Sequence, residues 1–187
     1  MIAYYCPATL IWLDVIPYAW RFHVLLLTAL GLAIYAGVSG YSLRDVGLRR
    51  DTLKGSLVAN SVLLAVATGG LVAAHAMGLI RAPRFPSWVW FFPLYVAVFS
   101  PAQEFACRAV LFAELDRRGV ASVAAQVLIT AVTYAFIHII YRDLLVLAAT
   151  LVAGIAWGAI YRRWPNLIGV AISHAGLGAS AISVGLI

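Results

Sequence analysis

Charged residues are scarce in this sequence. Only 11% of its 187 residues are Asp, Glu, Lys or Arg, whereas about 25% is usual in a soluble domain. Long stretches with almost no charge recur along the whole chain, and 64% of the residues are hydrophobic. This composition excludes a soluble globular core. It predicts an all-α polytopic membrane protein, and the length is that of a single domain.

Cysteine is also rare. Cys6 and Cys107 are too few for a disulfide framework, and Cys107 lies in an apolar segment where packing is a sufficient explanation. A cleavable signal peptide is not evident, because residues 1–16 lack a basic region and Asp14 interrupts the apolar run. No internal repeat is visible, which argues against an ion-coupled transporter.

The apolar runs predict the membrane helices, since a crossing needs about 20 residues. Six spans are expected, at residues 18–40, 55–80, 87–115, 121–141, 144–161 and 166–187. The third contains Pro93 and Pro101, each of which removes a hydrogen bond within a helix. The run RAPRFPS before it is expected to form a turn. Gly154 and Gly158 form a G-x-x-x-G pattern that permits close helix packing.

The basic residues indicate an orientation in the bilayer rather than a nucleic-acid patch. Eight lie in the connections at 41–54, 116–120 and 162–165, four lie on the opposite side, and Arg108 falls inside the third span. The positive-inside rule therefore predicts that both termini face away from the cytoplasm. The short, arginine-rich chain further suggests a bacterial inner membrane. No nucleic-acid partner is expected.

A polar group interrupts the third span. Gln103, Glu104 and Arg108 lie in the run Gln103-Glu104-Phe105-Ala106-Cys107-Arg108, and ionisable residues inside a membrane helix indicate a functional site. Glu104 and Arg108 share one helix face and can neutralise each other, so a purely structural ion pair is an alternative. His138 and His174 lie in later spans. His23 and His75, near span ends, need no special role.

Several kinds of chemistry suit these residues. A carboxylate and an imidazole can activate water, and a second imidazole can donate to an oxyanion, as amide hydrolysis requires. Glu104, His138 and His174 could also ligate zinc, although the usual H-E-x-x-H signature is absent. The residue types alone do not choose between these possibilities.

The order and spacing of these residues add a resemblance. Gln103-Glu104-x-x-x-Arg108, Tyr134-x-x-x-His138 and His174 resemble the three motifs of the CPBP family of intramembrane endopeptidases, which includes type II CAAX prenyl proteases and bacteriocin-processing or self-immunity proteins. Those motifs read E-E-x-x-x-R, F-x-x-x-H and H-x-x-x-N or H-x-x-x-D. The run Leu43–Arg49 and the run from Asn166 to His174 are similar to flanking segments of the family. The resemblance covers about residues 41–180. It implies a first segment at 1–40, which contains one membrane helix, and a protease core at 41–187.

The resemblance also implies roles for single residues. Gln103 occupies the water-activating position, His138 that of its partner base and His174 that of an oxyanion donor. Glu104 and Arg108 take the place of a structural pair, with Tyr134 as a supporting residue. Two departures stand out. Gln103 replaces a glutamate and cannot take a proton, and Gly178 replaces the Asn or Asp of the third motif.

Three interpretations of Gln103 follow. Glu104 acts as the base on a rotated helix, or His138 activates the water while Gln103 orients it, or the chain is catalytically inactive. The expected function is hydrolysis of a peptide bond in a membrane-embedded or membrane-proximal substrate, without a cofactor. The alternative is an inactive family member that acts as a membrane binding, scaffold or immunity partner. The expected partners are a membrane protein or peptide and the lipid bilayer.

Overall fold

The computed structural model describes residues 1–80 and 90–186 of the chain. The elements are, in chain order, α1 (Ile2–Trp12), η1 (Tyr18–Trp20), α2 (Arg21–Val38), α3 (Leu53–Ala76), α4 (Phe91–Leu94), η2 (Tyr95–Phe99), α5 (Ser100–Glu104), η3 (Phe105–Val110), α6 (Leu111–Arg117), α7 (Val123–Phe136), η4 (Ile137–Tyr141), α8 (Leu144–Arg163) and α9 (Leu167–Ser183). η1 and η4 are short 3-10 helices, whereas η2 and η3 are wider π-helical turns. These described residues form helices and no strand, so the prediction of an all-α fold is confirmed.

Five helical stretches are long and apolar enough to cross a bilayer. They are Tyr18–Val38, Leu53–Ala76, Phe91–Arg117, Val123–Tyr141 and Leu144–Arg163. The sixth expected span corresponds to α9, an apolar helix of 17 residues, which is slightly short of the roughly 20 residues of a full crossing. The chain is therefore an integral membrane protein. The expected turn RAPRFPS and the expected start of the third span at Ser87 lie outside the described residues.

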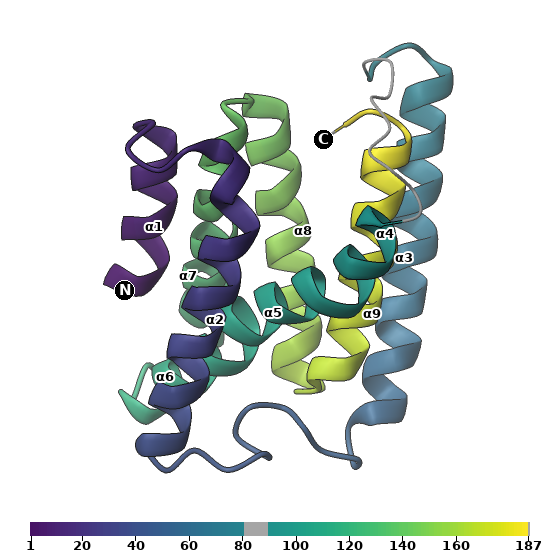
Figure 1. Cartoon of the computed structure of the whole chain (residues 1–187). Coiled ribbons are helices and arrows are strands. Elements are labelled where there is room, and N and C mark those ends of the chain that lie inside the picture. Colours follow the sequence, from purple (N-terminus) through teal and green to yellow (C-terminus); the bar gives the residue numbers. More distant parts are fainter. Residues whose placement is uncertain (81–89, 187) are drawn as a thin grey trace.

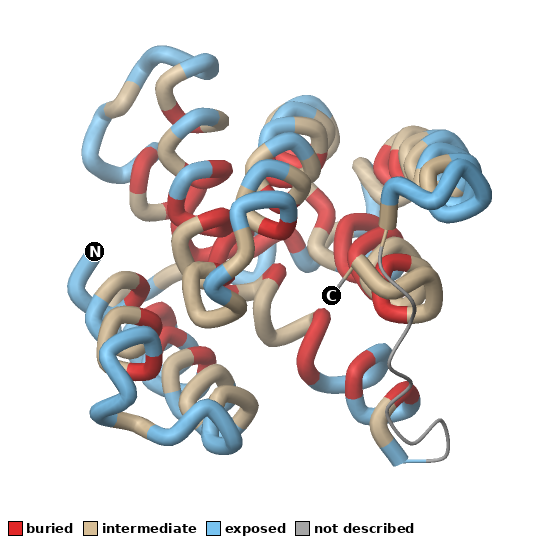
Figure 2. The backbone as a smooth tube through the Cα atoms, turned by 90° about the horizontal axis from the view of Figure 1, so that it is seen from above, coloured by how far each residue is buried: buried red, intermediate tan, exposed pale blue. Residues whose placement is uncertain are grey.

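The helices form a bundle, and the most extensive contacts are between two pairs of neighbouring helices. α7 lies along α8, and α3 lies along α9 at one edge of the bundle, while the helix from α4 to α6 runs obliquely across it (Figure 1). Seen from above, the buried positions face the middle of the bundle (Figure 2). A Cβ atom on Gly154 would lie 3.0 Å from the Cα atom of Ala131. The close approach predicted from the G-x-x-x-G pattern is therefore confirmed.

The N-terminal helix α1 has no counterpart among the expected spans. It is only 11 residues long and contains Pro7, so its sequence lacks the length that marks a membrane crossing. The Tyr4 hydroxyl donates a hydrogen bond to the Ala106 carbonyl at 3.0 Å, and the Tyr5 hydroxyl lies 3.0 Å from the Thr133 hydroxyl. These contacts hold α1 against η3 and α7, where it covers one side of the polar residues.

Proline explains part of the irregular shape of the third span. Pro101 has no amide hydrogen, so the carbonyl of Ala97, four residues earlier, cannot form its usual helical bond. The π-helical turn η2 lies at this place, and a second one, η3, follows directly after Glu104. Single π turns inside α-helices are frequent at functional sites. Here they bracket the segment that carries Gln103 and Glu104.

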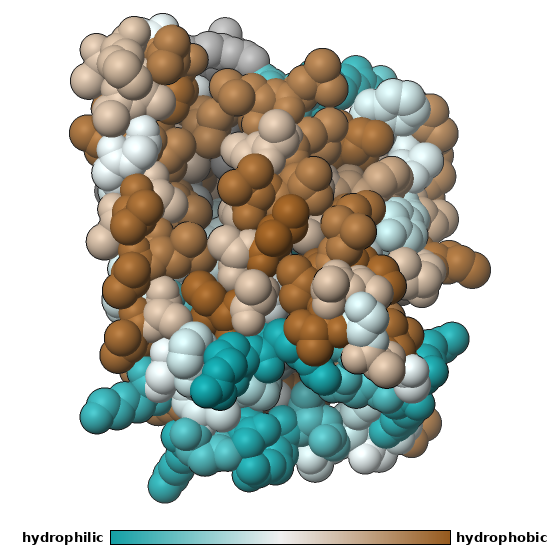
Figure 3. Space-filling model, turned by 180° about the vertical axis from the view of Figure 1, so that it is seen from behind, coloured by the Kyte–Doolittle hydropathy of each residue, from teal (hydrophilic) through white to brown (hydrophobic). Residues whose placement is uncertain are grey.

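The basic connections gather at one end of the bundle, which forms a hydrophilic base beneath the apolar sides (Figure 3). The Leu167 amide donates to the Gly47 carbonyl at 3.0 Å, and the Asn166 side chain donates to the Arg49 carbonyl at 2.6 Å. The loop before α3 is thereby joined to the start of α9. Gly47 has a φ of 74°, which favours glycine. In the same loop, hydrogen bonding from Arg49 holds the pKa of the Asp51 carboxyl well below its ordinary value.

Candidate active site

Glu104 and Arg108 form the buried centre of the polar group. Both side chains are 0% exposed, and Arg108 Nε lies 3.5 Å from Glu104 Oε2. The guanidinium carbon of Arg108 lies 4.5 Å from the centre of the Tyr134 ring and 5.9 Å from that of Trp157. A cation over aromatic faces and beside a carboxylate gains favourable electrostatic interactions in the absence of water. None of the three guanidinium nitrogens of Arg108 has a hydrogen-bond partner among the described residues. The pair predicted from the i,i+4 spacing is therefore present.

Glu104 has a second partner that lies on another helix. Its Oε1 atom is 2.7 Å from Nδ1 of His174 on α9. A carboxylate only accepts hydrogen bonds, so this nitrogen of His174 carries a hydrogen. Trp157 stacks on the imidazole, with ring centroids 5.0 Å apart and an angle of 19°, and donates to the Ser173 hydroxyl at 3.0 Å. These contacts fix the orientation of His174.

His138 is held differently. Its Nδ1 atom lies 2.7 Å from the backbone carbonyl of Tyr134, one turn earlier. Because a carbonyl cannot donate, Nδ1 carries the hydrogen, and in the neutral ring Nε2 keeps its lone pair. The ring of Tyr141 stacks beside the imidazole at 5.8 Å. His138 is only 6% exposed, so the Nε2 lone pair is largely shielded from the outside of the protein.

A cavity of about 480 Å³ lies between the helices that carry these residues. Its wall includes Gln103, Tyr134, His138 and His174, together with apolar residues of α3, α8 and α9. Glu104 is not part of that wall, because its carboxylate is turned toward His174 and Arg108. The residue that faces the cavity from the third span is therefore the neutral Gln103, and the charged Glu104 lies behind it.

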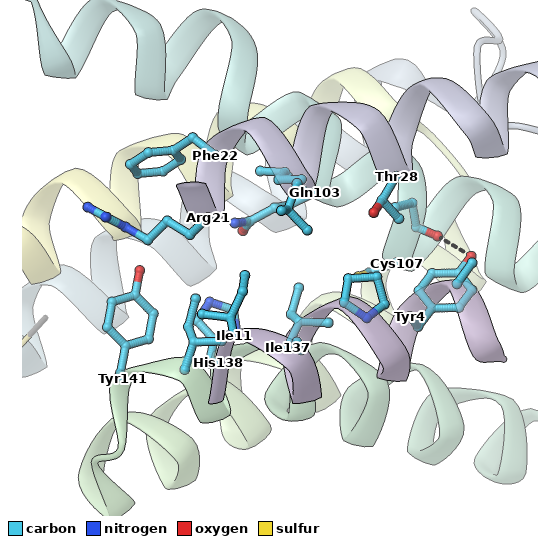
Figure 4. A pocket seen from close by; sticks show the side chains of 17 residues that line it. Tyr4, Ile11, Arg21, Phe22, Thr28, Gln103, Cys107, Ile137, His138 and Tyr141 are labelled. Carbon is cyan, nitrogen blue, oxygen red and sulfur yellow. Dashed lines mark hydrogen bonds between the residues drawn. The ribbon is translucent and has the colours of Figure 1, made fainter. Parts of the chain in front are cut away.

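A second cavity, of about 80 Å³, lies between this site and the N-terminal helices. Figure 4 shows Gln103 along one side of it and His138 along the other. Both residues also line the larger cavity, so they stand between the two spaces. The side-chain oxygen of Gln103 is buried and has no hydrogen-bond partner among the described residues. It is an acceptor that a water or a substrate amide can satisfy.

Gly178 lies one turn after His174 and admits a neighbour that the sequence did not indicate. The hydroxyl oxygen of Tyr95 occupies the space that a Cβ atom on residue 178 would need, and the adjacent Cζ atom lies 2.7 Å from that Cβ position. Tyr95, Trp157 and Tyr141 are the site residues that sequence reasoning missed. Trp157 lies between Gly154 and Gly158 and is marked only by that position, whereas nothing in the sequence marks Tyr95.

The set considered for zinc is arranged without an evident metal centre. Among the described residues, no three His, Cys, Asp or Glu side chains converge as a ligand group. Glu104 and His174 bond to each other through Oε1 and Nδ1. The cavity wall offers instead the lone pair of His138 and the free amide oxygen of Gln103, together with His174, whose imidazole is held by Glu104 from behind the wall. Such groups can activate a water molecule.

Fold and site together define a helical membrane protein with an imidazole-lined polar site inside the bundle. The sequence model of the family described as Type II CAAX prenyl endopeptidase Rce1-like matches residues 85–179, just over half of the chain. The chain therefore belongs to this family of intramembrane endopeptidases. No curated protein and no solved structure matches it. The match extends to α9 and includes Gln103, His138, His174 and Gly178.

Proposed function

We propose that this chain hydrolyses a peptide bond in a membrane-embedded or membrane-proximal substrate segment. One observation carries the proposal. The Nδ1–H of His138 is committed to the Tyr134 carbonyl, which leaves Nε2 as a base beside a cavity that Gln103 and His174 also line. A positioned imidazole with a free nitrogen lone pair is the commonest general base in enzymes. The family supports the same reaction class.

The reaction begins with a water molecule between Gln103 and His138. The free oxygen of Gln103 accepts one hydrogen of that water and orients it, although it takes no proton. His138 Nε2 removes the other hydrogen while the water oxygen bonds to the carbonyl carbon of the substrate. The tetrahedral intermediate then expels the amine, which receives its proton from His138. Glu104, which is paired with Arg108, holds His174 in place, and neither charged residue faces the substrate.

The setting of the reaction is part of the proposal. The cavity wall is mainly apolar, which suits a transmembrane or membrane-anchored peptide as the partner in the lipid bilayer. The basic end of the bundle (Figure 3) would face the cytoplasm of a bacterial inner membrane. The C-terminal end would then lie toward the other side of the membrane, whereas the N-terminal end lies about midway along the bundle (Figure 1). The proposed steps use no metal or organic cofactor.

Mass spectrometry of membrane-protein N-termini in host cells tests the function. Cells would express the chain as given, His138→Ala, His174→Ala or Gln103→Glu, with His75→Ala as the matched control because His75 is an exposed residue near the end of α3. We expect new N-termini with the unchanged chain and with His75→Ala, and none with His138→Ala. Elution as a folded species in detergent would establish that each variant is intact.

Gln103 and Gly178 depart from the family motifs, and these two departures favour a second candidate function, that of an inactive binding protein. An amide cannot serve as a proton acceptor at working pH, so an inactive family member would use the same cavity only to bind a membrane protein or peptide, as a scaffold or immunity partner. In that case the N-termini of all the cells would be alike. Termini that appear only with Gln103→Glu would mean that the fold is that of a protease and that the chain as given is inactive.

A further inference from the structure

The contact between Tyr95 and Gly178 supplies a hydrogen-bond donor to the cavity. We propose that the Tyr95 hydroxyl donates to the substrate carbonyl oxygen as this becomes an oxyanion, so that Tyr95 is a catalytic residue. The inference rests on the proposed proteolytic function. Tyr95 comes from η2 and Gly178 from α9, so the contact depends on the way in which these two elements cross.

Only a glycine at position 178 allows the hydroxyl to be where it is. A Cβ atom there would overlap the Tyr95 hydroxyl oxygen and would lie 2.7 Å from Cζ and 3.0 Å from Cε1 of the same ring. Residues four apart lie on one face of a helix, so Gly178 is on the same face of α9 as His174. The Tyr95 ring meets the His174 ring edge to face, with centroids 6.3 Å apart at 67°.

The hydroxyl is available to a ligand. Tyr95 is only 8% exposed, and it lines the cavity of about 480 Å³ together with His138, His174 and Gln103. A buried tyrosine hydroxyl usually has a hydrogen-bond partner. No described residue provides one for Tyr95, although the hydroxyls of Tyr4 and Tyr134 have partners. A donor that reaches a reaction cavity without a protein partner is free to bind an oxygen atom of the substrate.

His174 does not fill this role in its neutral form. A neutral imidazole has a single N–H, and Glu104 accepts it from Nδ1 at 2.7 Å. The Nε2 atom then carries a lone pair and lies 3.4 Å from the Tyr134 hydroxyl. The neutral ring thus has no hydrogen left for an oxyanion. The Tyr95 hydroxyl provides the missing donor, because it lies beside Gly178, one turn after His174 on the same face of α9.

The step balances without any other reactant. The water oxygen bonds to the carbonyl carbon, one proton of the water goes to His138 Nε2, and the carbonyl π electrons move to the oxygen that Tyr95 O–H contacts. When the C–N bond breaks, those electrons return to the carbonyl and the proton on His138 passes to the leaving nitrogen. The products are a carboxylic acid and an amine. Tyr95 keeps its proton throughout and contributes a hydrogen bond that strengthens as charge develops.

The test measures the initial rate at which His138-dependent N-termini form in host membranes, at equal protein levels. Tyr95→Phe removes only the hydroxyl, so we expect a fall of about 10²–10³-fold, the usual effect of losing one oxyanion donor. Its thermal midpoint in detergent should not change. Tyr161→Phe is the control, because it deletes another buried tyrosine hydroxyl without a hydrogen-bond partner that lies outside this cavity.

A second pair of variants separates catalysis from packing. Tyr95→Ala clears the space beside residue 178, and Tyr95→Ala/Gly178→Asn places an amide N–H donor there. The double variant should cleave at least about tenfold faster than Tyr95→Ala, because a side-chain amide can also donate to an oxyanion. Tyr95→Ala/Gly178→Leu is the matched control, because leucine refills the same space without an N–H donor and should therefore not recover the rate.

The outcomes distinguish the two claims. If Tyr95→Phe cleaves like the unchanged chain while His138→Ala does not cleave, proteolysis stands and the role of Tyr95 is overturned. If the unchanged chain produces no His138-dependent termini, the proposed function is overturned and the role of Tyr95 with it. If Tyr95→Phe loses both rate and thermal stability, the Tyr95→Ala/Gly178→Asn variant decides: recovery supports the inference, and no recovery overturns it.

Discussion

Glu104 and His174 are 70 residues apart in sequence, and Oε1 of one lies 2.7 Å from Nδ1 of the other inside the helical bundle. The remaining oxygen of Glu104 faces Arg108 at 3.5 Å. One carboxylate thus connects the third span to α9 and compensates a guanidinium that has no access to solvent.

Glu104→Gln should destabilise the protein by about 3–5 kcal/mol, because it leaves the buried cation of Arg108 uncompensated. Thermal or denaturant unfolding in detergent would measure the change. Glu104→Gln/Arg108→Met should recover most of the loss, since the double variant removes both charges. Arg118→Met is the control, because its partner Glu114 lies at the surface end of α6 and Arg118 is 71% exposed. It should cost at most about 1 kcal/mol. Equal losses in Glu104→Gln and Arg118→Met would refute the prediction.

Gln103→Glu should accelerate cleavage. Gln103 lines both cavities and matches the position of the water-activating glutamate in the family motif. In the proposed mechanism, a carboxylate there adds a second base beside His138. General-base catalysis contributes 10²–10⁴-fold, and we expect an increase of about ten- to a hundredfold with His138 still present. The rate at which new membrane-protein N-termini form would measure it. The increase should be absent from Gln103→Glu/His138→Ala, and a slower Gln103→Glu enzyme would contradict the proposed position of the water.

Chelation should not affect cleavage. The proposed steps need only His138 Nε2 and Gln103 as groups that touch water, and no three acidic, histidine or cysteine side chains of the described residues converge on one point. Membranes treated with 1,10-phenanthroline should therefore form new N-termini at the untreated rate, and added zinc should not increase it. A loss that zinc restores would show that Glu104, His138 and His174 rearrange into a metal site.

Gly154→Leu should weaken the contact between α7 and α8. A Cβ atom at residue 154 would lie 3.0 Å from Ala131 Cα and 3.2 Å from its carbonyl oxygen, so the helices must separate. Overpacking of this kind costs about 1–3 kcal/mol, which thermal unfolding in detergent would detect. Gly31→Leu on α2 is the matched control, because nothing lies within 4 Å of its Cβ position. A Gly154→Leu protein as stable as Gly31→Leu would show that the close approach is unimportant.

Much of the fold follows from local properties of the chain. Hydrophobic runs of about 20 residues predicted six spans, because a bilayer requires uninterrupted apolar helices. Five of them are long apolar helices in the structure, and the sixth is the 17-residue helix α9. The pairing of Glu104 with Arg108 was also accessible, since residues four apart share one face of a helix. The helix α1 escaped prediction for the opposite reason. At 11 residues it is too short to leave such a pattern, and its position depends on contacts with Ala106 and Thr133 far along the chain.

The amino-acid sequence by itself determined that this protein is a membrane protein and which residues are polar within its spans. It also determined that the side chain of Gln103 cannot take a proton at working pH and that Gly178 has no side-chain donor. Only the tertiary structure decided which polar groups face the cavity. It turns Glu104 toward His174, leaves Gln103 and His138 on the wall and brings the Tyr95 hydroxyl to Gly178. The reason is physical. Spacing places side chains on a face of one helix, but the partners they meet depend on how separate helices rotate and cross.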